Sequence, residues 1–304
     1  MSRHVAVLMG GVSAEREVSL VSGAACADAL EERGYRVSRI DVGRDLPRQL
    51  LELAPDCCFN ALHGRMGEDG RVQGLLDLLG IPYTHSGVLA SALAMDKPMA
   101  KRLFASVGLR CPEGVEITAA ALARDGSPLP PPFVVKPAAE GSSVGVSIVR
   151  DGALASVLAR NSLAPDDRLL VETYVPGHEL TCAVLDDRPL AVTEIAPRAD
   201  FYDYRAKYTD GLAEHRVPAP LPPPIYERVL EWSLAAHRVL GCRGVSRADF
   251  RFDPERGEDG LYLLEVNTQP GMTPLSLVPE QAAYCGIGFA DLVVRLVEEA
   301  RCDR

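Results

Sequence analysis

The segments RADFRFD and LYLLEVNT, separated by PERGEDG, hold the side chains best suited to chemistry in this 304-residue chain. Residues two apart in a strand share a face, so the first strand pairs Arg247 with Asp249. By the same spacing, the second strand pairs Glu265 with Asn267. A hairpin centred near Gly257 then sets Asp249 opposite Glu265. It also sets Arg247 opposite Asn267. Facing carboxylates repel unless a cation lies between them, so this set predicts Mg²⁺ with phosphate oxygens, against the alternative of acids on a solvated strand.

A Gly/Ser-rich loop, AAEGSSVG, is a second candidate, and it follows a strand that carries Lys136 near its end. Backbone N–H groups of such a loop can lie over phosphates, and Lys136 is well placed to reach the same anion. The segment lacks the G-x-x-x-x-G-K-[ST] pattern and no helix follows it directly, so it is not a Walker loop. A loop that is merely flexible is the alternative.

Three further segments complete the candidates. GGVSAEREVS carries Glu15 near a helix start, where N–H groups attract anions, although a first-turn acid also suits the helix dipole. ALHGRMGEDG puts His63 at the carboxyl end of a strand, where ligands bind in open α/β sheets, although a lone histidine is usually structural. FYDYRAKY (201–208) gathers four aromatics around Arg205 and Lys207, which predicts a water-excluding lid or a packed loop.

The elements that must position these residues alternate between strand and helix in the first part of the chain. Strands are predicted at Val5–Met9, Tyr35–Val42 and Cys57–Leu62. Helices are predicted from the Gly10-Gly11 break to Gly34, near Gln73–Leu79 and at Val88–Met95. Such alternation implies a parallel sheet, so residues 1–95 are expected to form a small α/β domain.

The remainder of the chain has a different pattern of predicted elements, which includes antiparallel strands. Strands are predicted at Phe133–Pro137, Val146–Arg150 and Arg168–Tyr174, and helices at Gly152–Asn161 and Ile225–Leu240. The segment LTCAVLDDRPLAV is predicted to be an antiparallel hairpin that turns at Asp186-Asp187. The fold class expected is α/β, or α+β overall, with units at 1–95, 96–176 and 177–304.

Composition excludes several classes of protein. The 32 Lys+Arg against 42 Asp+Glu give a net charge of -10, which argues against nucleic-acid binding through clustered cations. The longest uncharged stretch is too broken for membrane insertion, and the eight cysteines lack C-x-x-C spacing. We therefore expect a reduced cytoplasm and no structural zinc. Only Lys97, Lys101, Lys136 and Lys207 are lysines, and each can mark a place where a planar guanidinium does not fit; Lys101 is expected on ordinary surface.

The motifs together resemble the D-alanine–D-alanine ligases of the ATP-grasp superfamily. They run in order as VAVLMGGVSAEREVSL, ALHGRMGEDG, ASALAMDK, VVKPAAEGSSVG, FYDYRAKY, RADF and LLEVNTQPGMTPLSLVP, and so cover essentially the whole chain. The resemblance implies an N-terminal parallel α/β domain followed by a two-part ATP-grasp fold. It also implies ATP-dependent joining of two D-alanines through an acyl phosphate, releasing ADP and phosphate, for peptidoglycan precursor synthesis in the cytoplasm.

Residue roles are implied by this resemblance, position by position. The implied ATP contacts are Lys97, Lys136, Glu172 on adenine, Tyr174, Val175, Glu179 on ribose, and Lys207. The implied ligands of Mg²⁺, as two ions that Mn²⁺ can replace, are Asp249, Glu265 and Asn267. The implied substrate contacts are Glu15, His63, Ser142 and Tyr208 for the first D-alanine, Arg247 and the Gly271 backbone for the oxyanion, and Ser276 and Leu277 for the second carboxylate.

The sequence departs from the family pattern at two positions. Gln269 stands where a smaller or apolar residue is more usual, and Tyr174 where some relatives have Trp; neither change removes a charged ligand. The alternatives are a ligase for another second substrate, such as D-lactate or D-serine, and a nucleotide-binding sensor without catalysis. Tyr208 favours alanine over lactate, and the intact hairpin set argues against a sensor. The expected partners are ATP, D-alanine and a second copy of the chain in a homodimer.

Overall fold

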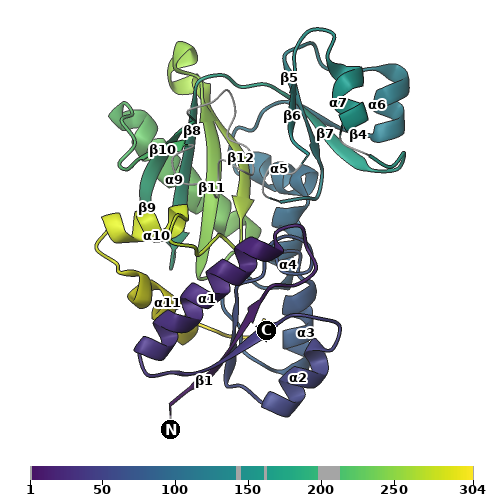
Figure 1. Ribbon diagram of the computed structural model, residues 1–304. Coiled ribbons are helices and arrows are strands. Elements are labelled where there is room, and N and C mark those ends of the chain that lie inside the picture. The colour runs from purple at the N-terminus through teal and green to yellow at the C-terminus, as the bar shows by residue number, and fades with distance from the viewer. Residues whose placement is uncertain (1, 142–144, 161–162, 198–212, 304) are drawn as a thin grey trace.

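A computed structural model of the chain describes residues 2–141, 145–160, 163–197 and 213–303, which form three sheets and the helices around them (Figure 1). The first sheet has the order β2-β1-β3 and is parallel. Its strands and helices are β1 (His4–Met9), α1 (Arg16–Glu32), β2 (Arg36–Asp41), α2 (Leu46–Leu53), β3 (Cys57–Asn60), α3 (Arg71–Leu79) and α4 (Val88–Met95). The predicted parallel α/β unit is therefore confirmed, and the central strand β1 is buried along its whole length, as parallel strands usually are.

The second sheet is antiparallel, with the order β4-β7-β5-β6. Its elements are α5 (Lys97–Ser106), β4 (Gly114–Thr118), α6 (Ala119–Asp125), β5 (Phe133–Pro137), β6 (Ser147–Val149), α7 (Leu154–Arg160) and β7 (Arg168–Thr173). The sequence predicted β5 to the residue, whereas β6 is shorter at both ends than expected. β4 was not predicted, because its GVEIT segment is exposed along most of its length and lacks a run of apolar residues.

The third sheet is also antiparallel and has the order β10-β9-β8-β11-β12. Its elements are β8 (His178–Leu185), β9 (Arg188–Pro197), β10 (Ala213–Arg216), α9 (Pro223–Leu240), β11 (Val245–Phe252), the 3₁₀ helix η1 (Pro254–Gly260), β12 (Leu261–Asn267), α10 (Leu277–Tyr284) and α11 (Phe289–Glu298). The predicted turn at Asp186-Asp187 is confirmed, and both residues have positive φ, which aspartate tolerates in hairpin turns.

The register of β11 against β12 is the one that the residue spacing predicts. Asp249 lies opposite Glu265, and Arg247 lies opposite Asn267. A bulge follows Asp249, so the pairing beyond it shifts by one residue. Phe250 is fully buried on the opposite face, beneath α9, and this burial fixes which face of the hairpin carries the polar set.

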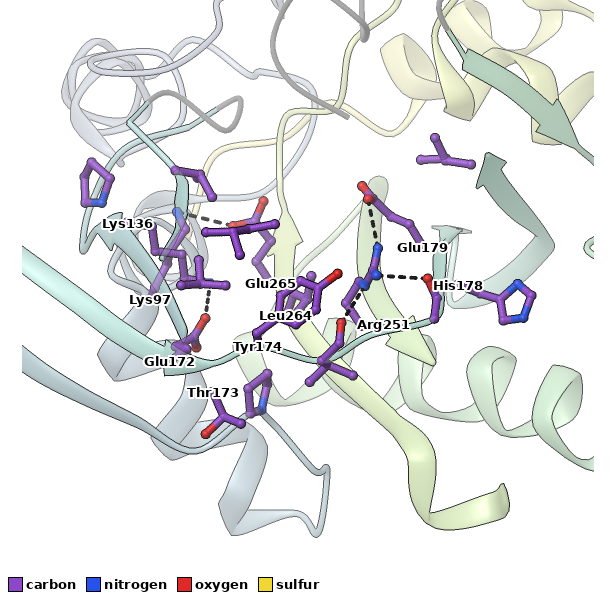
Figure 2. A pocket seen from close by; sticks show the side chains of 18 of the residues that line it. Lys97, Lys136, Glu172, Thr173, Tyr174, His178, Glu179, Arg251, Leu264 and Glu265 are labelled. Atoms are coloured by element: carbon purple, nitrogen blue, oxygen red, sulfur yellow. Dashed lines mark hydrogen bonds and ion pairs between the residues drawn. The ribbon is translucent and has the colours of Figure 1, made fainter. Parts of the chain in front are cut away.

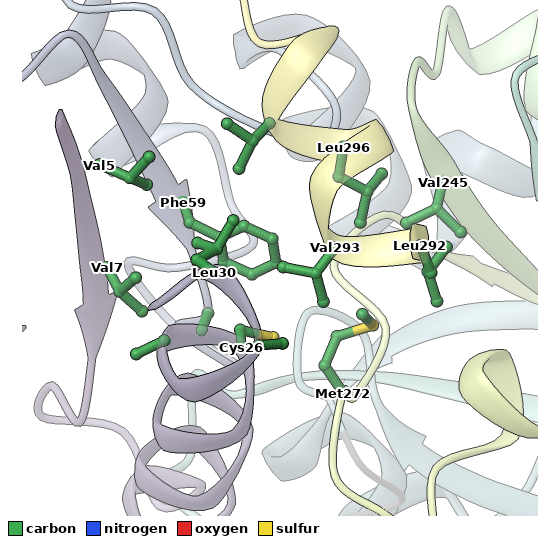
Figure 3. Packing of buried hydrophobic residues seen from close by; sticks show 14 of the residues in the cluster. Val5, Val7, Cys26, Leu30, Phe59, Val245, Met272, Leu292, Val293 and Leu296 are labelled. Atoms are coloured by element: carbon green, nitrogen blue, oxygen red, sulfur yellow. The ribbon is translucent and has the colours of Figure 1, made fainter. Parts of the chain in front are cut away.

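The hydrophobic core of the first sheet is shared with the last helices of the chain. Val5, Val7 and Phe59 pack with α1 and with Leu292, Val293 and Leu296 of α11 (Figure 3). This cluster also contains Met272, which lies in the loop between β12 and α10. The three-unit division at 95 and 176 stays a prediction. In the described part of the chain, no helix is long and apolar enough to cross a membrane.

Candidate functional site

A cavity of about 540 Å³ lies between the second and third sheets (Figure 2). Lys97, Lys136, Glu172 and Glu265 stand at one end of it, and Tyr174, Glu179 and Arg251 stand at the other. Its walls are mainly apolar, with Val134, Val146, Ile148, Val175, Ile195 and Leu264 among the lining residues. A deep slot with apolar walls and a cationic end suits a flat base joined to a polyphosphate.

The cationic end is a set of buried ion pairs. Lys136 at the end of β5 lies with its Nζ 2.5 Å from Oε2 of Glu172 on β7. Lys97 opens α5, and its Nζ donates to the Glu140 carbonyl at 2.5 Å and lies 3.3 Å from Oε2 of Glu265. Burial lowers the pKa of Lys136, but the charges of Glu172 and Glu265 more than offset it, so the net shift is upward. The end of the cavity thus holds fixed positive charge, as an incoming phosphate group requires.

Lys101 does not lie on ordinary surface, so that expectation was wrong. It is one turn beyond Lys97 on α5, but its side chain is only 13% exposed and pairs with Glu172. Its Nζ also donates to the Pro112 carbonyl at 2.7 Å. Burial alone raises the pKa of Glu172, but the charges of Lys136 and Lys101 pull it below its ordinary value.

The opposite end of the cavity is organised by Arg251. Its guanidinium donates to the Val175 carbonyl at 3.1 Å and the Gly177 carbonyl at 2.9 Å, and lies 3.4 Å from Oε2 of Glu179. The guanidinium carbon of Arg150 lies 5.7 Å from the centroid of the Tyr174 ring. Arg251 was missed from the sequence, although it shares a strand face with Arg247 and Asp249, and that spacing could have identified it.

The polar face of the β11–β12 hairpin carries oxygen-bearing side chains of the kind that bind hard metal ions. Arg247 forks onto Asp249 with bonds of 2.8 and 2.7 Å, and Thr181 of β8 donates to Asp249 Oδ1 at 2.7 Å. Asn267 Oδ1 accepts from the Gln269 N–H at 3.1 Å. Two carboxylates and an amide oxygen fit Mg²⁺ when phosphate oxygens fill its other positions. In the described ranges, no cluster of three His, Cys, Asp or Glu groups could hold a metal without such help.

A second group of polar side chains lies around Glu15, just before α1. Glu15 is buried, and its carboxylate lies against Gly64, where a Cβ would come within 2.3 Å of it. The positive φ of Gly64 also favours glycine at this position. His63 lies nearby, with Nε2 3.1 Å from Ser22 Oγ and Nδ1 3.4 Å from Glu68 Oε1. Glu68, one of the two acids in ALHGRMGEDG, is therefore a site residue that the sequence did not single out.

The loop after β12 brings together Gly271 and Ser276. A Cβ on Gly271 would lie 2.8 Å from Ser276 Oγ, so the Gly271 backbone approaches this hydroxyl closely. Ser276 is the residue before α10, which starts at Leu277, and its Oγ accepts from the Thr273 N–H at 2.9 Å. The first N–H groups of α10 are suited to hold a carboxylate.

Gln269, the family departure, joins this loop to the first sheet through buried hydrogen bonds. Its Nε2 donates to the Asn60 carbonyl and lies 3.2 Å from His85 Nδ1, and its Oε1 accepts from Asn60 Nδ2 at 3.0 Å. Burial lowers the pKa of His85 to about 3, so its ring is neutral and can accept from Gln269. Three expected site residues, Ser142, Lys207 and Tyr208, lie outside the described residues.

The comparisons with known proteins agree with this geometry. The family described as "D-ala D-ala ligase C-terminus" matches residues 107–298, and the one described as "D-ala D-ala ligase N-terminus" matches residues 47–86. A D-alanine–D-alanine ligase of Methylobacterium radiotolerans is 58% identical over 308 residues, covering 100% of each chain. Another, of Sphingopyxis alaskensis, is 56% identical and covers 98% of this chain and 97% of its own.

Solved structures match over the same length. The D-alanine–D-alanine ligase of Bacillus anthracis superposes with a TM-score of 0.82 at 35% identity, covering 98% of this chain and 97% of its own. The Bacillus anthracis structure complexed with ATP gives a TM-score of 0.80 at 36% identity, covering 98% and 96%. A D-Ala:D-Ser ligase of Enterococcus faecalis gives 0.80 at 28% identity, covering 98% and 99%.

The two antiparallel sheets closing on a cavity with lysines at one end define the class of ATP-grasp proteins. Within that class, the chain belongs to the D-alanine–D-alanine ligase family, since the C-terminal family description alone covers more than half of its residues.

Proposed function

We propose that this chain joins two D-alanine molecules at the expense of ATP, releasing ADP and phosphate, as a cytoplasmic step of peptidoglycan precursor synthesis. The observation that carries the proposal is the contact between two sites through neighbouring residues. Glu140 lines the nucleotide cavity and binds Lys97, while a Cβ on Gly141 would lie 3.1 Å from the Glu15 carboxylate. A phosphate in the cavity and an amino acid at Glu15 would therefore be neighbours.

The proposed chemistry follows from these positions. Lys97 and Lys136 hold the phosphates, with Lys207 as a third cation, and offset charge on the group in transfer to the first substrate's carboxylate. Glu15, assisted by Ser142, Tyr208 and His63, holds the ammonium of the first D-alanine. Mg²⁺, as two ions held by Asp249, Glu265 and Asn267, would supply charge stabilisation at the phosphates when bound, and Mn²⁺ can replace it.

The second half of the reaction uses the loop after β12. The second D-alanine is held by its carboxylate at Ser276 and Leu277, and its amine attacks the acyl phosphate. Arg247 and the Gly271 N–H stabilise the resulting oxyanion, and one such donor is worth roughly 3–4 kcal/mol of transition-state stabilisation. The adenine is proposed to lie against Glu172, Tyr174 and Val175, with the ribose at Glu179.

The test is phosphate release by the purified chain with ATP and Mg²⁺ over a panel of D-amino acids and D-lactate. D-Alanine is expected to give phosphate and the dipeptide, increasingly as pH rises, because the attacking amine must be neutral. If phosphate release with D-alanine requires D-serine or D-lactate as the acceptor, D-alanine is not the second substrate. Nucleotide binding without turnover would refute catalysis. The Enterococcus faecalis neighbour makes D-serine the acceptor to compare first.

The proposed assembly is a homodimer in the cytoplasm. Each chain is proposed to consist of three units, at 1–95, 96–176 and 177–304. All eight cysteines are free thiols, which fits a reducing compartment. Sedimentation of the purified chain measures the assembly, and a monomer at the concentration that supports full activity would refute the dimer.

A further inference from the structure

We propose that Lys101 is a positioning residue for the nucleotide: it holds the Glu172 carboxylate as the acceptor for the adenine amino group. The inference rests on the proposed function, since it concerns the nucleotide cavity. It assigns a role to the one lysine that the sequence placed on the surface.

The geometry gives one carboxylate two ammonium partners. Glu172 accepts from Lys101 at Oε1, and its Oε2 lies 2.5 Å from Lys136 Nζ. All three side chains are at most 13% exposed. The two lysines come from different elements, α5 and β5, and only Lys136 also lines the cavity.

This arrangement lets the two lysines serve different partners when a nucleotide enters. Lys136 is at the cationic end beside Lys97 and Glu265, so a bound phosphate would draw it away from Glu172. A buried carboxylate left without any partner is strongly disfavoured. Lys101, held by the Pro112 carbonyl at 2.7 Å, remains with Glu172 and keeps it ionised and in place.

An ionised Glu172 can only accept hydrogen bonds. On its base edge, adenine offers the 6-amino group as its donor. A protonated Glu172 accepts more weakly from this amino group and a displaced Glu172 loses the contact, while the phosphate contacts remain in both cases. The groups facing Glu172 are Lys101, Lys136 and the Cys111 thiol, and burial raises the pKa of that thiol to about 11, so it carries no charge near neutral pH.

The space around Lys101 explains why a lysine stands here in a chain that otherwise uses arginine. A Cβ on Gly114 would lie 3.0 Å from Lys101 Nζ and 2.9 Å from Glu172 Cγ. β4 thus passes directly against the ion pair. A compact ammonium fits this gap, whereas the planar fork of arginine needs more room.

The experiment compares Lys101→Met with Arg102→Met, a control at the next position of α5 whose side chain is exposed. Affinities are measured by calorimetry for ATP and for purine riboside triphosphate, which lacks the 6-amino group. We expect Lys101→Met to weaken the binding of ATP at least tenfold and to leave the affinity for the analogue within about threefold of the wild type. The KM for ATP should rise, with kcat within about twofold of the wild-type value. Arg102→Met should match the wild type.

A pH series adds a second readout. In Lys101→Met, ATP binding should weaken as pH falls from 8 to 6, because Glu172 has lost Lys101 and the bound phosphate draws Lys136 away, so the buried carboxylate takes up a proton more readily. In the wild type, ATP affinity should not change over this pH range. Lys101→Gln, which still donates to the Pro112 carbonyl but has no charge, should behave in the same way and serves if the methionine variant fails to fold.

Equal loss of affinity for both nucleotides, or unchanged ATP affinity in a folded variant, would overturn the proposal. Failure of the proposed ligase function would give a result different from failure of the Lys101 proposal. The wild type would then bind ATP with the same dependence on Lys101 but form no dipeptide.

Discussion

Replacing Gln269 by leucine tests whether the loop after β12, which carries the proposed oxyanion group, is held in place from the first sheet. β3 is bonded to β1 along one side, and the N–H and C=O of Asn60 face the other side. The N–H donates to Thr84 Oγ1 at 3.0 Å, and the carbonyl accepts from Gln269. Leucine has a similar volume to glutamine but no hydrogen-bonding group, so the substitution removes the link and leaves little empty space.

The magnitude follows from the groups left behind. The Asn60 carbonyl loses its side-chain donor, and one Asn60 Nδ2 hydrogen loses its acceptor, while the other still bonds the Gly67 carbonyl at 2.9 Å. Each buried group without a partner costs about 1–3 kcal/mol, so the free energy of unfolding should fall by about 2–6 kcal/mol. A chain of this size loses roughly 1.5–2 °C in Tm per kcal/mol. Because reacting groups displaced by 1 Å can cost about a hundredfold, kcat should fall roughly tenfold to a hundredfold.

The control is Gln281→Leu on α10. Gln281 is equally buried and also loses three hydrogen bonds, to the Ala183 N–H, the Thr181 carbonyl and Thr193 Oγ1. Its partners lie on strands β8 and β9, which the sheet ladder still holds. Both variants should lower the Tm, but only Gln269→Leu should lower kcat with the KM for ATP near the wild-type value. If the two variants lose kcat equally, or if Gln269→Leu keeps full kcat despite its lower Tm, the positioning argument fails.

The remaining predictions concern one residue each. Glu265→Gln should abolish phosphate release while circular dichroism and Tm stay near the wild type; a near-normal rate would contradict the metal assignment. Asp303→Ala removes the carboxylate that accepts from the first N–H of α4 at 2.8 Å, and should cost about 0.5–2 kcal/mol in urea unfolding, with unchanged activity. Burial, together with the bond to Asp186, raises the pKa of Glu299 to about 7. A raised carboxyl pKa stabilises the fold below about pH 4.5 and loses this effect as pH rises through 7, so Glu299→Gln should flatten the fall in Tm between pH 5 and 8. An equally steep fall in that variant would show that other groups cause it.

The sequence predicted best what depends on local spacing. The pairing of Asp249 with Glu265 came from the period of a strand and the centre of one turn, and the structure confirms it. The parallel first sheet and the hairpin at Asp186-Asp187 were equally accessible, since strand patterns and turn residues carry them. The roles of the site residues remain predictions.

What the sequence could not predict depends on contacts between distant segments. Lys101 was placed on the surface because no motif in the sequence gave it a role, and only the approach of β7 and β4 buries it against Glu172. Gln269 was identified only as a departure from the family pattern, and its structural role could not be predicted because its partner, Asn60, lies 209 positions away. Hydrogen bonds of this kind leave no periodic trace in the sequence.

The packing of α11 on the first sheet has a consequence for how this protein is made. Val5 and Phe59 leave the ribosome early, but the helix residues that cover them, such as Val293 and Leu296, are among the last to be synthesised. The part of this apolar surface that α1 does not cover therefore stays exposed for most of translation, and contacts so far apart in sequence form slowly. A fragment that stops at residue 95 should consequently aggregate when expressed alone, and recover solubility when a peptide carrying α11 is supplied. Until α11 has been synthesised, this exposed apolar surface is therefore expected to bind chaperones.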